Sequence, residues 1–187
     1  MVPTKDLKQK EGDDATAAAQ DEENFPVAFY LGGQHKNDHT DDQGFRYDAY
    51  ISYANRGQDA AWVWETLVPR LEKAGIRVAI SGDVEEPGVA RVVNIERGIR
   101  QSKRTVVVLS DAYLNDNVSD FENVLAQTMG LQEGRHRLLP VRIAQLSENQ
   151  VPVRLNMLTT LDMTRPQYME REFARLVQAL QGPLSHR

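Results

Sequence analysis

Short apolar runs alternate with amphipathic segments from residue 45 to the end of the chain. Five of the runs are brief and rich in β-branched and aromatic residues, which is typical of strands. They span residues 47–53, 76–80, 105–109, 138–143 and 158–162. Because the run at 105–109, Thr-Val-Val-Val-Leu, shows no polar alternation, we expect a strand that is covered on both faces. The runs therefore predict a sheet buried between layers of helix.

The segments between the runs carry apolar residues at the three- and four-residue spacing of a helix. These helical patterns cover about residues 60–74, 92–99, 119–131 and 173–182. In the first of them, the interior Pro69 is expected to kink or split the helix, and Gly75 follows as a C-terminal cap. Trp62 falls off the apolar stripe of this helix, so surface cover, packing on a neighbouring element and a contact patch all stay open.

The repeated order of strand and helix predicts an α/β fold, with a five-stranded parallel sheet and helices on both faces. For five strands we expect the flavodoxin-like, doubly wound order 2-1-3-4-5. Ligands bind such sheets beyond the carboxyl ends of the strands, where the strand order reverses, here between the first and third strands. This rule selects residues 53–55, the loop at 81–88, and the segment that runs from Ser110 into the helix containing Glu122.

Length and composition limit the organisation of the chain. With 187 residues, 41% of them hydrophobic and 26% charged, it has room for one ordinary domain and an appendage. We expect an acidic, largely disordered leader over residues 1–44 and a folded domain over residues 45–187. Cysteine is absent, and neither a secretory signal nor an apolar run of membrane-spanning length is visible, so we expect a cytoplasmic location.

Charge and motif spacing exclude several classes of partner. The net charge of −5 is concentrated in residues 1–44, so the domain lacks the basic surface that nucleic acids bind. We expect neither nucleic-acid nor membrane binding. His35 and His39 have the spacing of metal ligands on a helix, but their Gly/Asn/Asp-rich surroundings favour a solvated linker, so no metal site is expected. Glycine-rich phosphate loops and nucleophile elbows are absent as well.

Glu122 is the sharpest candidate for chemistry, and the residues alone leave two interpretations open. Ser119-Asp-Phe-Glu122 matches a capping box, in which Ser119 caps the helix and Glu122 bonds back to the Ser119 amide. The position of Glu122 at the reversal of strand order favours a functional role instead. The loop at 81–88 is also ambiguous, because it fits a solvated acidic connection but is longer than usual, which favours binding.

Five segments follow one another in a recognisable order. They are Tyr47-Asp-Ala-Tyr-Ile-Ser-Tyr-Ala54, Glu-Lys-Ala-Gly-Ile-Arg-Val at 72–78, Glu86-Pro-Gly88, Val106-Val-Val-Leu-Ser-Asp-Ala-Tyr-Leu114 and Leu138-Leu-Pro-Val-Arg142. Together they resemble a Toll/interleukin-1 receptor (TIR) domain over about residues 45–182, and the last two resemble bacterial members most. The resemblance implies the flavodoxin-like fold. It also identifies residues from Ser81 to about Arg91 with the BB loop, which mediates contacts between TIR domains and covers a nucleotide pocket.

The resemblance further implies an activity. Catalytic TIR domains cleave NAD+ with one glutamate on the helix after the third strand, and counting back from Leu138 places Glu122 on it. We therefore expect an NAD+ glycohydrolase, with ADP-ribose cyclisation as a second outcome, in bacterial immune or toxin signalling. NAD+ is then a substrate and no cofactor is expected. By position, the substrate-binding residues are Tyr53, Ala54, Asn55, Ile80, Glu86, Ser110 and Phe121, and the BB-loop contact residues are Ser81, Gly82, Asp83, Val84, Glu85, Pro87 and Gly88.

The alternative is a non-catalytic module that signals through TIR–TIR contacts. Members of the family carry tryptophan either directly after the glutamate or four residues ahead of it, where this chain has Asn123 and Val118. This departure and the capping-box pattern favour the alternative. Under both hypotheses we expect self-association and a sensor domain or partner protein that this chain does not contain.

Overall fold

The computed structural model describes residues 44–80, 86–132, 136–147 and 149–184, without the side chains of 117–121, 129 and 131–132. The expected leader up to residue 43, including His35 and His39, therefore lies outside the described residues. The same holds for Ser81, Gly82, Asp83, Val84 and Glu85 of the BB loop. Among the residues that are described, no helix combines the length and apolar character needed to cross a bilayer.

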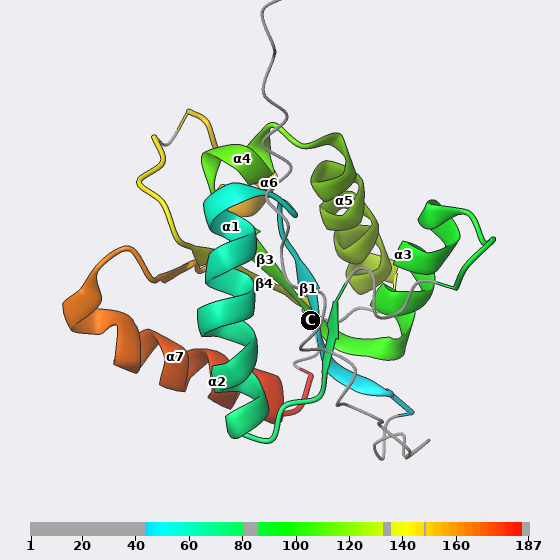
Figure 1. Cartoon of the computed structure of the whole chain (residues 1–187), viewed down its shortest axis with the longest axis horizontal. Coiled ribbons are helices and arrows are strands. Elements are labelled where there is room, and N and C mark those ends of the chain that lie inside the picture. Colours follow the sequence, from blue (N-terminus) through cyan, green and yellow to red (C-terminus); the bar gives the residue numbers. More distant parts are fainter. Residues whose placement is uncertain (1–43, 81–85, 133–135, 148, 185–187) are drawn as a thin grey trace, which may run out of the picture. The chain divides into compact units, whose positions relative to one another are not determined.

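Five parallel strands form one sheet in the order β2-β1-β3-β4-β5 (Figure 1). The strands are β1 (Tyr47–Ser52), β2 (Val78–Ile80), β3 (Ser102–Leu109), β4 (Leu138–Arg142) and β5 (Leu161–Asp162). This order confirms the predicted doubly wound, flavodoxin-like α/β fold. The fifth strand is shorter than predicted, because Leu158 donates its backbone N–H to the carbonyl of Leu155 and so closes a turn after a short helix.

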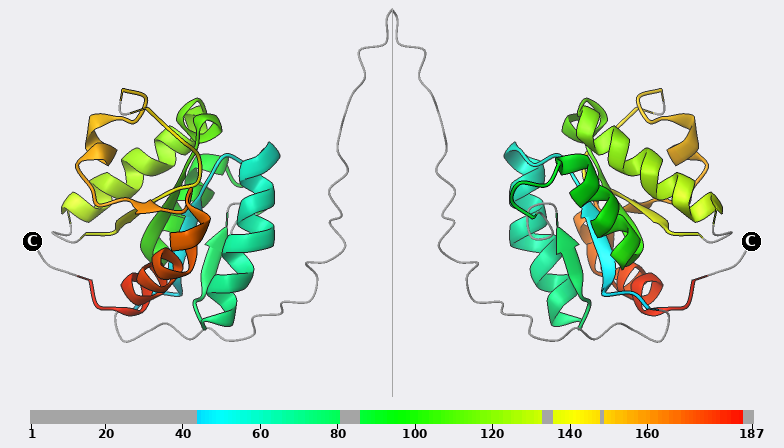
Figure 2. Two further views of the ribbon diagram at one scale, coloured as in Figure 1. Left: turned by 90° about the vertical axis from the view of Figure 1, so that its left-hand side faces the viewer. Right: turned by 90° about the vertical axis from the view of Figure 1, so that its right-hand side faces the viewer.

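Helices cover both faces of the sheet. They are α1 (Gly57–Trp62), η2 (Val63–Leu67), α2 (Val68–Lys73), α3 (Arg91–Gln101), α4 (Asp111–Leu114), α5 (Asn117–Gln132), α6 (Val153–Asn156) and α7 (Pro166–Gln181). Buried residues of η2, α2 and α7 pack on one face of β1, whereas α3 and α5 pack on the other (Figures 1 and 2). The short helices α4 and α6 were not predicted, because four residues are too few to show helical periodicity.

The chain stays helical through Pro69, although its hydrogen bonding changes. A π-helical turn, η2, separates α1 from α2, and Pro69 occupies the first turn of α2. The missing N–H of proline breaks the α-helical pattern, and a π turn just before it accommodates the break without ending the helix. Trp62 stacks on Phe173 of α7 with ring centroids 6.2 Å apart, so of the three interpretations packing on a neighbouring element is confirmed.

Buried cations fill the amino end of the sheet. Lys103 donates to the carbonyl of Leu180 at the end of α7, and Arg137 donates to the carbonyl of Ile99 at 2.7 Å. Arg104 is likewise buried and bonds only to backbone carbonyls among the described residues. The bonds of Lys103 and Arg137 satisfy carbonyls in the last turns of α7 and α3, which helix ends leave without partners. They also explain why β3 begins at Ser102, three polar residues before the apolar run that predicted it.

Gly75 ends the first helical segment with a positive φ of 77°. Its N–H bonds to the carbonyl of Glu72 at 2.9 Å and that of Ile76 to the carbonyl of Leu71 at 3.0 Å, which is the Schellman arrangement. We predict that Gly75→Ala lowers the free energy of unfolding by about 1 kcal/mol, because this backbone conformation is unfavourable for L-residues. Nothing lies within 4 Å of an added Cβ, so the loss is conformational. Equilibrium urea unfolding measures it, and Gly75→Asn, which tolerates this conformation better, should lose less. Equal losses for the two variants would contradict the explanation.

Candidate functional site

A cavity of about 300 Å³ opens beyond the carboxyl end of β1, where the reversal of strand order predicts a ligand site. It is lined by Ile51, Tyr53, Asn55, Arg56, Arg91, Asp116 and Glu122. The lining residues come from β1 and the loop after it, the start of α3, the segment before α5, and α5 itself. The cavity therefore brings together parts of the chain that are far apart in the sequence.

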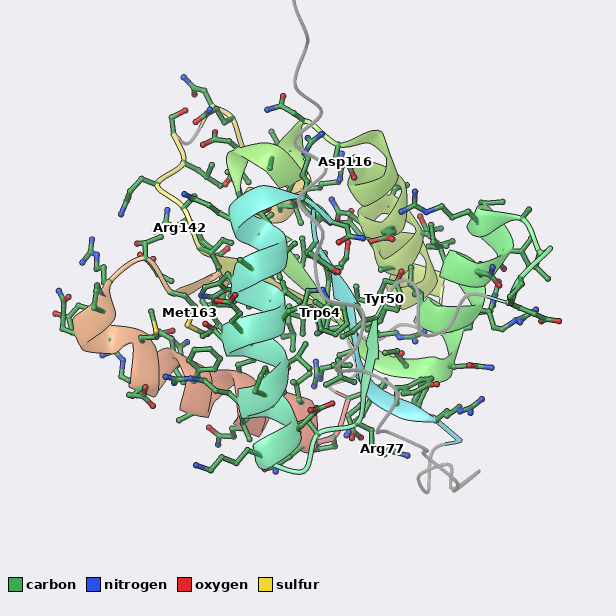
Figure 3. All side chains as sticks on the ribbon, in the orientation of Figure 1. Tyr50, Trp64, Arg77, Asp116, Arg142 and Met163 are labelled. Atoms are coloured by element: carbon green, nitrogen blue, oxygen red, sulfur yellow. The ribbon has the colours of Figure 1, made fainter. Side chains whose placement is uncertain are left out.

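The Glu122 carboxylate faces β1. The side chain is 3% exposed, and the Tyr50 hydroxyl donates to its Oε1 at 3.0 Å. The Ser52 hydroxyl donates to the same carboxylate. Tyr50 and Ser52 lie two apart on β1, so both side chains point to the face that α5 covers, and Figure 3 shows Tyr50 in the region between β1 and the helices α3 and α5.

The capping-box interpretation of Glu122 is wrong. The helix begins at Asn117, so Ser119 lies inside its first turn instead of preceding the helix as a cap. Glu122 then lies beyond the first turn, and its carboxylate bonds to Tyr50 and Ser52 of the sheet. The acidic group at this position thus faces the neighbouring strand and the cavity.

Burial raises the pKa of Glu122 to about 7. The hydrogen bonds from Ser52 and Tyr50 and the positive charge of Arg91 oppose this rise, whereas the negative charge of Asp116 adds to it. Asp116 lies at the start of α5 in Figure 3. A carboxyl group that titrates near neutrality inside a cavity is characteristic of functional sites, because it changes protonation in the range where enzymes work.

Hydrogen bonds hold the part of the cavity wall that follows β1. Trp64 donates its indole N–H to the Tyr53 hydroxyl at 3.1 Å, and that hydroxyl donates to Asn55 Oδ1 at 3.3 Å. Arg56 donates to the backbone carbonyl of Ala112 in α4 at 3.0 Å. Hydrogen bonds therefore connect the wall to both η2 and α4. Of the substrate-binding residues expected from the sequence, Tyr53 and Asn55 lie here, in the same cavity as Glu122.

Three other expected binding residues do not line the cavity. Ala54 and Ile80 are fully buried in apolar clusters of the core, since the strand ends that carry them are covered by helices. Ser110 is buried and caps α4, accepting from the N–H of Tyr113 at 3.0 Å and donating to the Asp59 carboxylate. The structure therefore places these three residues outside the cavity wall, and their expected contact with a ligand stays a prediction.

The described end of the expected BB loop is fastened to α3. Pro87 and Gly88 form the middle of a turn closed by the Val89 N–H on the Glu86 carbonyl at 3.1 Å, with Gly88 at a φ of 85°. Pro-Gly is the pair that a type II turn requires. The Glu86 carboxylate forms an ion pair with Arg97 at 2.7 Å, so Glu86 is also absent from the cavity wall. The side chain of Phe121 lies outside the described residues.

Sequence reasoning did not select Tyr50, Ser52, Arg56 or Asp116, and it placed Arg91 only at the end of the expected BB loop. The alternation of β1 contains a usable signal for the first two, because residues two apart on a strand share a face. Arg91 and Asp116 lie at the ends of connections that follow β2 and β3. These connections carry no periodic pattern of apolar residues, so the sequence carries no sign that the two side chains reach the cavity. Within the described ranges, no cluster of histidine and acidic side chains is suited to holding a metal ion.

Comparison with known proteins gives a consistent result. A family model described as TIR domain matches residues 50–177. Toll-like receptor 6 of Mus musculus is 30% identical over 128 residues, which cover 68% of this chain and 16% of the receptor. The chain thus spans about a sixth of the length of such receptors. The bacterial-type part of the resemblance stays a prediction.

Solved structures agree with the family model. The TIR domain of the Toll-related receptor TRR-2 from Hydra magnipapillata is 29% identical, with a TM-score of 0.62, and the match covers 73% of this chain and 99% of that one. A TIR-STING receptor from C. gigas is 23% identical with a TM-score of 0.62, covering 76% of this chain and 42% of that one. This second likeness shows the fold alone.

We predict that the unfolding free energy depends on pH through Glu122. The folded-state pKa is raised, so the unfolded chain ionises first and stability is lost as pH rises from about 4.5 to about 7. Relative to Glu122→Gln, the wild type should lose up to about 3 kcal/mol over this range and then level off. Urea unfolding at a series of pH values measures the difference. Glu170→Gln, on the exposed surface of α7, is the control, and parallel curves for wild type and Glu122→Gln would contradict the assignment.

Proposed function

Because the chain belongs to the TIR-domain family, we propose that it is an NAD+ glycohydrolase with Glu122 as the catalytic carboxylate. The products are nicotinamide and ADP-ribose, the latter linear or cyclised. One observation carries the proposal: the carboxylate is buried yet lines a cavity at the reversal of strand order, and its described hydrogen-bond partners belong to the sheet. A glutamate that only capped its own helix would have its carboxylate bonded to the helix backbone, and not to the sheet beside a cavity.

A single carboxylate suits this chemistry. The bond between the ribose C1′ and the nicotinamide nitrogen breaks with its electron pair going to nitrogen, so the cationic base leaves neutral without a general acid. The barrier lies in the positive charge that develops on the ribose, as in glycoside hydrolysis. An ionised Glu122 beside that charge stabilises it where it forms. Water then adds to C1′ and releases a proton.

The remaining lining residues suit other parts of the substrate. Arg56 and Arg91 supply positive charge on the wall of the cavity, and guanidinium groups bind phosphate oxygens well. The Tyr53 ring offers an apolar face to the nicotinamide base. A volume of about 300 Å³ is at the lower limit for ligand pockets. It matches the nicotinamide-ribose half of NAD+, so the adenosine half would extend beyond it.

The biological setting follows from the family and the sequence. We place the activity in the cytoplasm, in immune, antiviral or toxin signalling of the bacterial kind, with self-association of TIR domains as the step that switches it on. A sensor domain or a partner protein would supply the trigger, since the chain spans only a small part of the receptors that it matches.

Nicotinamide release from NAD+ tests the proposal. We predict that the wild type releases nicotinamide and that Glu122→Gln lowers the rate at least about 100-fold, the usual scale for losing an electrostatic stabiliser of the transition state. Chromatography of the products follows the reaction, at high protein concentration and with a crowding agent to favour assembly. Glu170→Gln should keep wild-type activity, since its exposed carboxylate pairs with Arg70 on the opposite side of the sheet from α5. Absence of release by the wild type under all these conditions would refute the proposal.

The second candidate is a non-catalytic module that acts through TIR–TIR contacts. Val92 and Val93, at the start of α3 beside the Glu86–Gly88 turn, are 48% and 44% exposed. Neighbouring apolar side chains that face solvent mark contact surfaces.

We predict that the double substitution Val92→Asp, Val93→Asp lowers self-association, because it places two charges on an apolar contact. Analytical ultracentrifugation over a range of concentrations measures the shift. Val153→Asp, an equally conservative change in size on the exposed face of α6, is the matched control. Unchanged association of the double variant would exclude this surface. If assembly proceeds normally in wild type while no NAD+ is cleaved, the module is the better description of the chain.

A further inference from the structure

Four buried side chains from three elements form one chain of hydrogen bonds around Glu122. The Tyr50 hydroxyl lies 3.0 Å from Glu122 Oε1, and the Ser52 and Tyr113 hydroxyls lie 2.9 Å apart. Ser52 also bonds to the Glu122 carboxylate. None of the four side chains is more than 3% exposed. Buried polar groups in such a network are worth more together than singly, because a low dielectric strengthens every bond.

The direction of each bond follows from the number of protons available. An ionised carboxylate only accepts, so the Tyr50 and Ser52 hydroxyls both donate to Glu122. A serine hydroxyl has one proton, so Ser52 cannot also donate to Tyr113. Tyr113 therefore donates to Ser52, and the network runs from Tyr113 through Ser52 to Glu122, with Tyr50 donating from the other side.

The local structure holds each donor in place. Tyr50 and Ser52 belong to β1 in the centre of the sheet, where β2 and β3 pair with it on either side. Tyr113 belongs to α4, whose first turn is capped by Ser110. The donors thus rest on rigid elements, which is what a site needs if its reacting group is to keep one orientation.

We propose that Tyr50 and Ser52, with Tyr113 behind Ser52, are positioning residues that fix the orientation of the Glu122 carboxylate for the ribose of NAD+. This inference rests on the proposed function. A carboxylate has about four acceptor sites. The two donors from β1 occupy the side facing the sheet, and the sites facing the cavity stay available to ribose hydroxyls and to the developing positive charge.

The same donors favour the ionised state that the reaction needs. The other charged groups that act on Glu122 are Arg91 from α3, which favours ionisation, and Asp116 before α5, which opposes it. Without the Tyr50 hydroxyl, fewer hydrogen bonds stabilise the buried negative charge, so the Glu122 carboxyl keeps its proton to a higher pH. Loss of a donor therefore changes both the orientation and the titration of Glu122.

The experiment combines a titration with an assay. Glutamate labelled with ¹³C at the carboxyl carbon reports the pKa of Glu122 by NMR in the full chain, with Glu122→Gln used to assign its signal. We expect Tyr50→Phe and Ser52→Ala each to raise this pKa by about one unit, and Tyr113→Phe to raise it less, because Tyr113 acts through Ser52. Tyr168→Phe, which removes a hydroxyl from the exposed face of α7, should change nothing.

In the assay, Tyr50→Phe and Ser52→Ala should lower kcat for nicotinamide release about 10-fold with little change in KM. The acid limb of the pH–activity profile should also move to higher pH, by the same amount as the pKa measured by NMR. Unchanged titration and unchanged kcat in both variants would overturn the positioning role, even in an active enzyme. Suppose instead that the wild type releases no nicotinamide while the pKa of Glu122 shifts as expected in the two variants. That result would overturn the proposed function, and with it the catalytic role of the network.

Discussion

The contact between the Glu122 carboxylate and the hydroxyls of β1 is the constraint on which the candidate site depends. A carboxylate that is 3% exposed is costly to ionise unless donors compensate for the lost water. Tyr50 and Ser52 supply those donors from the central part of the sheet. The contact connects α5 to β1 while leaving the carboxylate at the wall of the cavity, so the stability of the fold and the state of the site are linked.

The two ends of the sheet use charge in opposite ways. At the amino end, three buried cations donate hydrogen bonds to backbone carbonyls: Lys103, Arg104 and Arg137. These bonds fill that end of the sheet. At the carboxyl end, Arg56 and Arg91 stand at a cavity beside a carboxylate whose pKa is raised. The first arrangement is structural, because these bonds all go to backbone carbonyls at or near the ends of helices and strands. The second places charged side chains on the wall of a cavity, and that is why the proposed ligand chemistry is assigned there.

Much of the fold was predictable because its signals are local. The unbroken apolar run of β3, the helical spacing around Leu67 and Leu71, and the Gly75 cap each reflect a preference that acts within a few residues. The start of β3 was not predictable, because Ser102, Lys103 and Arg104 are polar and become strand only through bonds to distant parts of the chain. The short helices α4 and α6 are likewise set by packing on β3 and the core.

By itself the sequence determined the sheet, its strand order and the region in which a ligand site is expected, because apolar periodicity specifies which faces are buried and buried faces restrict the topology. It also singled out Glu122, though without choosing between a cap and a catalytic group. Only the tertiary structure excluded the cap, because that depends on where the carboxylate of residue 122 points, and the hydroxyl of residue 50 lies 3.0 Å from it. It also removed Ala54, Ile80 and Ser110 from the cavity wall and added Arg56, Arg91 and Asp116. The direction in which a side chain points at the end of a strand is set by the helices packed around it, and no local pattern encodes that.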